Sequence, residues 1–88
     1  MKLIDPDKLL AQVGRRIAEL RARRDLTQEQ LAEKIEVSSR YLQSVEGGTE
    51  NLTLETLAKF ANALKVPVIV MFEPPATKKP GPGRPSKK

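Results

Sequence analysis

The chain has 88 residues, of which 16 are Lys or Arg and 11 are Asp or Glu, giving a formal net charge of +5, and it contains no cysteine or histidine. The absence of cysteine excludes disulfides and thiolate metal sites, and the absence of histidine removes the commonest general base. The sequence also contains no nucleophile–base pair and no glycine-rich phosphate loop. We therefore expect a protein that is not an enzyme and holds no metal or cofactor. No apolar run approaches the length of a membrane span and residues 1–6 do not read as a signal peptide, so we expect one small cytoplasmic domain with no membrane partner.

The first predicted helix covers residues 6–24. Asp5 is a suitable N-cap, and Pro6 is favoured in the first turn of a helix. Apolar residues then recur at steps of three and four, which places them on one face: Leu10, Val13, Ile17 and Leu20. The same stretch contains a candidate basic patch for a polyanionic partner, formed by Arg15, Arg16, Arg21, Arg23 and Arg24.

Residues 27–48 read as two short helices, 28–35 and 39–46, joined by a tight turn. Thr27 can cap the first helix and Gln30 completes a capping box, while Ser38 can cap the second helix. The apolar residues fall on the inner faces: Leu31, Ala32, Ile35, Leu42 and Val45. The outward face of the second helix is polar and cationic: Ser39, Arg40, Gln43 and Ser44. Such a face on a crossed second helix suits the DNA major groove.

A family resemblance lies in the opening Thr-Gln-x-x-Leu-Ala from Thr27 and the closing Glu-x-Gly that ends at Gly48. The segment resembles the helix-turn-helix of the lambdoid repressors, also called the Cro/C1 or XRE type, over roughly residues 10–66. This resemblance implies a four-helix lambda repressor-like domain that binds double-stranded DNA. The family often has glycine in the turn, where this chain has Glu36, and a left-handed backbone there would be strained.

The resemblance also implies which residues read DNA bases. Ser39, Arg40, Gln43 and Ser44 match the family's base-contacting positions. Arg40 can bond a guanine in bidentate fashion, and Gln43 can pair with an adenine. The alternative interpretation is a solvated polar face on an ordinary helix.

Other matched positions concern the DNA backbone and the support of the second helix. Gln28 corresponds to a residue that contacts phosphate at a helix N-terminus, although it is also simply a favourable residue at that place. Arg21 and Glu46 match an ion pair of the family's repressors, which we interpret as structural. Three residues are either phosphate contacts or solvated surface residues: Arg15, Arg16 and Asn51.

A fourth helix is predicted from its cap at Thr53 to Lys65. Its apolar stripe consists of Leu54, Leu57, Ala58, Ala61 and Leu64. After Pro67 the character changes, because the next five residues are all apolar and three of them are β-branched. This composition favours a strand.

We therefore expect a dimerising strand at 67–73, formed by Val68, Ile69, Val70, Met71 and Phe72. A lone strand leaves its backbone groups without partners, and antiparallel pairing with the same strand of a second copy resolves this. Here the chain resembles hip-type antitoxins, which have an intersubunit ribbon after helix four. The alternative is a fifth helix that packs on its own domain or on a partner.

The tail, residues 76–88, consists largely of Lys, Pro and Gly and should be disordered when free. Its basic residues account for the whole net charge, since acidic and basic side chains balance in the rest of the chain. The run Gly83-Arg84-Pro85 resembles the centre of an AT-hook, which lies in the minor groove, but Pro82 stands where arginine is usual. The alternative is a merely electrostatic tail.

These observations predict an all-α fold, with a helix-turn-helix domain at 1–75 and a basic tail at 76–88. The predicted function is sequence-specific DNA binding by a homodimer at a palindromic operator, giving transcriptional regulation and most simply repression. The alternative is an antitoxin that binds a toxin protein and also represses its own operon. A third possibility is an architectural DNA-binding protein led by the tail.

Overall fold

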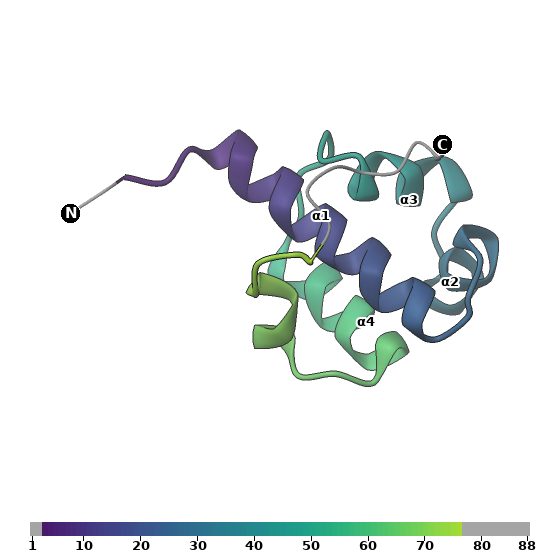
Figure 1. The fold of residues 1–88 in the computed structure, drawn as a ribbon. Helices are drawn as coiled ribbons and strands as arrows, with labels where there is room; N and C mark the ends of the chain where they lie inside the picture. The colour runs from purple at the N-terminus through teal and green to yellow at the C-terminus, as the bar shows by residue number, and fades with distance from the viewer. Residues whose placement is uncertain (1–2, 77–88) are drawn as a thin grey trace, which may run out of the picture.

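The computed structural model describes residues 3–76, which form four α-helices and one short 3-10 helix, with no strand in this part of the chain (Figure 1). Helix α1 spans Pro6–Arg23, α2 spans Gln28–Ile35, α3 spans Ser39–Glu46 and α4 spans Leu54–Leu64. The 3-10 helix η1 spans Val68–Phe72. Among these residues, no helix combines the length and the apolar character needed to cross a membrane.

Each α-helix begins at a side chain that accepts a hydrogen bond from the backbone of the first turn. The predicted capping box of α2 is present: the Gln30 N–H donates to Thr27 Oγ1 at 3.0 Å, and the Thr27 N–H donates to Gln30 Oε1 at 2.8 Å. The predicted caps of α1, α3 and α4 are also formed, by Asp5, Ser38 and Thr53. Since one such cap stabilises a helix by about 1 kcal/mol, these local contacts explain why the helix starts agree with the sequence.

The turn between α2 and α3 has a left-handed backbone, although Glu36 and not glycine occupies it. Glu36 has φ 63° and ψ 45°, and the following Val37 N–H donates to the Ala32 carbonyl at 2.9 Å. The end of α4 repeats this arrangement, with Lys65 at φ 60°. A residue with a Cβ in this conformation costs about 1–2 kcal/mol relative to the right-handed one, so both turns are strained.

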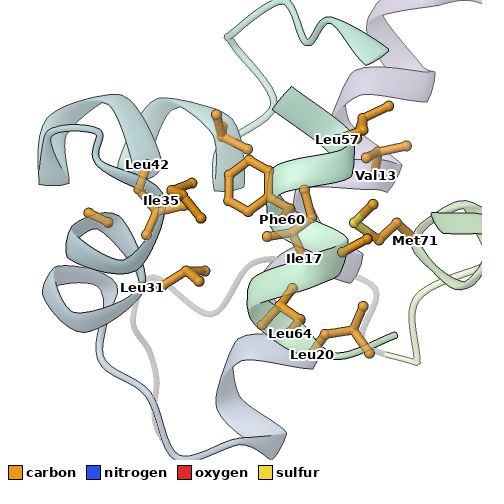
Figure 2. Packing of buried hydrophobic residues seen from close by; sticks show 13 residues of the cluster. Val13, Ile17, Leu20, Leu31, Ile35, Leu42, Leu57, Phe60, Leu64 and Met71 are labelled. Atoms are coloured by element: carbon orange, nitrogen blue, oxygen red, sulfur yellow. The ribbon is translucent and has the colours of Figure 1, made fainter. Parts of the chain in front are cut away.

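The hydrophobic core is gathered around Phe60 of α4. Figure 2 shows Phe60 between the side chains of α2 and α3 on one side and those of α1 and η1 on the other. The buried core residues are Val13, Ile17, Leu20, Leu31, Ala32, Ile35, Leu42, Val45, Leu57, Phe60, Ala61, Leu64 and Met71. Burial of an aliphatic or aromatic side chain stabilises a fold by about 1.5–3 kcal/mol, and this shared cluster joins all five elements.

Two glycines let α1 and α3 cross closely. A Cβ at Gly14 would collide with the carbonyl oxygen of Val45, so the α1 backbone lies directly against the end of α3. Gly48, with φ +80°, lies just after α3, and a Cβ there would be 2.7 Å from the Cα of Ala11. The sequence does not predict this crossing, because a glycine within a helix gives no local sign of what packs against it.

The predicted strand at 67–73 is wrong, because Val68–Phe72 forms η1 and packs on its own domain. The side chain of Met71 is buried in the core, and that of Val70 is half-buried. The Val70 N–H donates to the Pro67 carbonyl at 3.0 Å, and the Glu73 N–H donates to the Val70 carbonyl at 3.3 Å. Its backbone therefore finds partners within the chain, as the alternative of a fifth helix required.

The predicted apolar stripe of α4 is partly wrong. Leu57, Ala61 and Leu64 are buried as expected, but Leu54 is 81% exposed and Ala58 is also exposed. Phe60 occupies the centre of the core instead, since it lies three residues after Leu57 on the face that meets α2. The stripe is thus rotated toward Phe60 relative to the predicted one.

Candidate nucleic-acid interface

The structure brings the four candidate base-reading residues together on the solvent side of α3. Arg40 and Gln43 are exposed and lie one turn apart, while Ser39 and Ser44 beside them are half-buried. The opposite side of α3 is anchored in the core by Leu42 and Val45. This helix therefore presents one short row of hydrogen-bonding side chains, with a cation near its N-terminal end.

The C-terminal end of α3 is held to α1 by the ion pair that the family resemblance implied. Arg21 Nε donates to Glu46 Oε2 at 2.7 Å, and Arg21 Nη2 donates to Glu46 Oε1 at 3.0 Å. The remaining Arg21 Nη1 donates to the Leu26 carbonyl at 2.8 Å, just before α2. Because Glu46 is buried and the pairing is bidentate, this contact holds α3 at a defined orientation relative to α1 and α2.

Gln28 joins the same cluster, a contact that sequence reasoning missed. Gln28 Nε2 donates to Glu46 Oε1 at 2.9 Å, although 18 residues separate the two in the chain. One amide hydrogen of Gln28 is therefore held by Glu46, and the other is oriented by that bond. The Gln28 backbone N–H belongs to the first turn of α2, where N–H groups have no intrahelical acceptor. We name Arg21, Gln28 and Glu46 the Glu46 cluster.

The structure contradicts the predicted phosphate contact of Arg16. Its side chain is buried, and its Nε donates to the Val70 carbonyl at 3.0 Å. Its Nη2 lies 2.8 Å from Glu73 Oε1, and its Nη1 lies 3.3 Å from Glu19 Oε1. All three guanidinium nitrogens are thus engaged between α1 and the end of η1. A sequence pattern could not reveal this role, because Glu73 lies 57 residues away.

The predicted basic patch of five arginines is therefore not a free cationic surface. Arg16 and Arg21 are held by acidic side chains, and Arg24 Nε donates to the Leu64 carbonyl at 2.9 Å, at the end of α4. Arg23 is exposed. Arg15 is half-buried, and its buried Nε has no hydrogen-bond partner among residues 3–76.

Arg15 and Asn51, the other two predicted phosphate contacts, belong to α1 and to the loop that follows α3. Arg15 lies one turn after Ala11, whose backbone abuts Gly48 in the loop that follows α3. Asn51 is exposed in the same loop. The loop is held to α3 by the Thr49 N–H, which donates to the Ser44 carbonyl at 3.0 Å.

The remaining site predictions fall into two groups. Of the predicted dimer residues, Val68, Ile69 and Phe72 are exposed, whereas Met71 is buried and Val70 is half-buried. The candidate minor-groove residues Gly83, Arg84 and Pro85 lie outside the described residues.

Two consecutive capped helices, the second with a polar outer face, define a helix-turn-helix protein. Residues 17–70 match the helix-turn-helix family HTH_3, and the chain belongs to this family. That match extends from the middle of α1 into η1 and includes the complete Glu46 cluster.

Known relatives carry regulatory names. The chain is 46% identical over 56 residues to the immunity repressor protein of Bacillus phage phi105, a match that covers 64% of this chain and 39% of that repressor. It is 39% identical over 62 residues to an uncharacterized HTH-type transcriptional regulator, y4dJ, of Sinorhizobium fredii, which covers 70% of this chain and 80% of the relative. The chain thus spans well under half of the phage repressor's length but most of the second relative.

Solved structures of similar proteins agree with this fold. The restriction-modification controller protein C.AhdI of Aeromonas hydrophila has a TM-score of 0.69 and 35% identity, covering 72% of this chain and 96% of that protein. A hypothetical transcription factor, NHTF, from Neisseria has a TM-score of 0.73 and 28% identity, covering 85% and 86% of the two chains.

Proposed function

We propose that this protein is a sequence-specific DNA-binding transcriptional regulator, most simply a repressor, which acts as a homodimer on a palindromic operator. The observation that carries this proposal is the exposed polar face of α3, held at its far end by the Glu46 cluster. The regulatory names of the relatives support the same function.

In this proposal the outer face of α3 reads base edges in the major groove. Arg40 bonds the O6 and N7 atoms of a guanine, and Gln43 bonds an adenine, while Ser39 and Ser44 supply shorter polar contacts. Each bidentate pair discriminates against a wrong base by about 1–3 kcal/mol. Arg40 is therefore the residue whose loss should relax the sequence preference most.

The backbone contacts are assigned to the start of α2 and to the loop after α3. Gln28 meets a phosphate through its free amide hydrogen and its backbone N–H, aided by the helix dipole. Its bond to Glu46 fixes the amide before DNA arrives, which lowers the entropy cost of the contact. Arg15 and Asn51 are the further proposed phosphate contacts.

The homodimer is assigned to the apolar surface that η1 leaves open. Val68, Ile69 and Phe72 are all exposed there, and exposed apolar patches of this kind commonly mark protein–protein contacts. A twofold dimer would place two α3 helices on half-sites about one helical turn apart, which is why a palindrome is expected.

The tail is assigned a secondary role in affinity. Residues 76–88 carry five basic side chains, and contacts with the DNA backbone would add binding that weakens as salt rises. Insertion of Gly83, Arg84 and Pro85 into the minor groove is the finer version of this proposal. The antitoxin alternative and its toxin partner lose their main support, because no intersubunit strand forms at 67–73.

The decisive experiment is selection of bound DNA from a random pool. Three proteins are compared with the full chain: Arg40→Ala, a chain ending at Ala76, and Arg23→Ala as a control for loss of an exposed arginine at the end of α1. We expect a palindromic site that survives the truncation and Arg23→Ala but is lost in Arg40→Ala. An A·T-rich preference that depends only on the tail, or no enrichment at all, would overturn the proposal.

A further inference from the structure

An apolar pocket lies on the side of the molecule where α1, α4 and η1 meet. It has a volume of about 100 Å³, which suits one branched aliphatic side chain. Its lining residues among those described are all apolar: Leu9, Leu10, Val13, Leu52, Leu57 and Phe72. Phe72 at its edge is 38% exposed, so the pocket opens onto the apolar surface of η1 that was assigned to the homodimer.

The N-terminal arm, residues 3–5, carries two aliphatic side chains, either of which could fill such a pocket. Leu3 is 91% exposed and Ile4 is 72% exposed. Figure 1 shows this end of the chain running away from the helices. The cap residue Asp5 is extended, with φ −77° and ψ 118°, which sets the direction in which the arm leaves α1.

The arm does not cover the pocket of its own chain. Ile4 and Leu9 occupy the two positions that often pack together as a hydrophobic staple at a helix start. Here Ile4 stays largely exposed, so Leu9 contributes to an open pocket instead of to a staple. Because these two aliphatic side chains are exposed and do not line the apolar pocket of their own chain, we look to another molecule for the pocket's occupant.

We infer that the N-terminal arm of one copy docks into the apolar pocket of a second copy, and that the second copy reciprocates. This inference rests on the proposed homodimer, and it adds a second, arm-mediated contact to the surface of η1. Reciprocal exchange is what a twofold axis requires, since the same surface must serve both partners.

Charges on the arm and on the first turn of α1 favour a second copy of this chain over an unrelated apolar partner. Asp5, Asp7 and Lys8 are exposed, and none of them forms an ion pair with another residue of 3–76. Lys8 directly precedes Leu9 at the edge of the pocket. In an antiparallel exchange, attraction between Lys8 of each copy and the carboxylates of Asp5 and Asp7 of the other would favour one register.

The first test is the dimer dissociation constant of the full chain, measured by sedimentation equilibrium. The double variant Leu3→Ser/Ile4→Ser should dimerise at least about tenfold more weakly, because buried apolar area is lost from both arms. Leu54→Ser is the control, since the exposure of Leu54 lies between those of Leu3 and Ile4 and Leu54 does not line the pocket. It should leave the dissociation constant unchanged. Thermal melting of both variants establishes that the fold is retained.

The second test uses cysteine pairs, which are clean probes because the chain has no cysteine. Protein carrying Ile4→Cys is mixed with protein carrying Leu52→Cys and oxidised, and the disulfide is located by mass spectrometry. A 4–52 bond between the two proteins is expected, since such a bond requires Cα atoms within about 7 Å.

The outcomes separate the inference from the proposed dimer. A dimer that is unaffected by Leu3→Ser/Ile4→Ser and gives no 4–52 bond would overturn the arm exchange alone. A 4–52 bond that forms only within one chain, in a protein carrying both cysteines, would also overturn it and place the arm in its own pocket. A chain that stays monomeric at all concentrations would overturn the dimer and the exchange together. Loss of the dimer in Ile69→Ser but not in the arm variant would support the η1 surface without the arm.

Discussion

Helices α3 and η1 are both attached to α1 through an arginine, but the two attachments differ in kind. Arg21 forms a bidentate pair with Glu46, and both side chains are largely buried. Arg16 is also buried, but it holds a backbone carbonyl, that of Val70, and the carboxylate of Glu73, which is 55% exposed. The Arg21–Glu46 attachment is an ion pair largely shielded from water, whereas the Glu73 carboxylate of the Arg16 attachment is exposed to water.

This difference suggests how firmly each element is held. A buried charge pair is costly to break from one side, because the remaining charge has no partner, so α3 should be held in one orientation. The exposed part of the Arg16 attachment contributes little, because water screens it, and η1 depends mainly on Met71 and the Val70 carbonyl. The proposed base-reading face thus belongs to the firmly attached helix α3, and the proposed dimer surface belongs to the less firmly attached helix η1.

The largest expected effect comes from breaking the firm attachment. Arg21→Ala leaves Glu46 buried without its counter-charge and should lower the free energy of unfolding by about 3 kcal/mol. DNA binding should weaken as well, since Gln28 also loses its defined orientation. Urea denaturation measures the first effect, with Arg23→Ala as the control for an exposed arginine. An unchanged unfolding curve for Arg21→Ala would contradict a structural role of the Glu46 cluster.

A smaller effect is expected from breaking the softer attachment. Arg16→Met keeps much of the length of the side chain but removes the donor to the Val70 carbonyl and the ion pairs with Glu19 and Glu73. It should lower the free energy of unfolding by about 1–2 kcal/mol. Hydrogen exchange should rise at η1 and not at α3. Equal loss of protection at both helices would show that the two attachments are not independent.

The two strained turns test whether strain differs between the two regions. Glu36 precedes α3 and Lys65 precedes η1, and both have left-handed backbones. Glu36→Gly and Lys65→Gly should each raise the free energy of unfolding by about 0.5–1 kcal/mol, because glycine adopts this conformation without a steric cost. Glu33→Gly, inside α2, is the control and should lower it by about 1 kcal/mol. If all three glycines destabilise the protein alike, backbone strain plays no part at these turns.

The smallest effect is expected at the exposed half of the Arg16 attachment. Glu73→Gln should change the free energy of unfolding by less than about 0.5 kcal/mol, since its carboxylate is exposed and the pair is screened. The measurement is urea denaturation at low and high salt. A loss as large as that of Arg16→Met would mean that Glu73, and not the Val70 carbonyl, holds η1.

The sequence alone determined the features that arise within a few residues of one another. The capping box of Thr27 and Gln30, the four helix starts and the polar face of α3 each depend on spacings of three or four residues, which a helix converts directly into contacts. The pairing of Arg21 with Glu46 came from the family resemblance and not from spacing, because 25 residues separate the two.

Only the tertiary structure decided the features that depend on contacts between segments far apart in the sequence. Arg15 and Arg16 are neighbours in an arginine-rich helix, yet Arg16 donates hydrogen bonds to the Val70 carbonyl and the Glu73 carboxylate, which lie more than 50 residues away in the sequence. Five apolar residues at 68–72 satisfy strand and helix patterns alike, and the fit of Met71 beside α1 and α4 selects the helix. Local preference is worth only tenths of a kcal/mol per residue, so core packing and burial of hydrogen-bonding groups settle such cases.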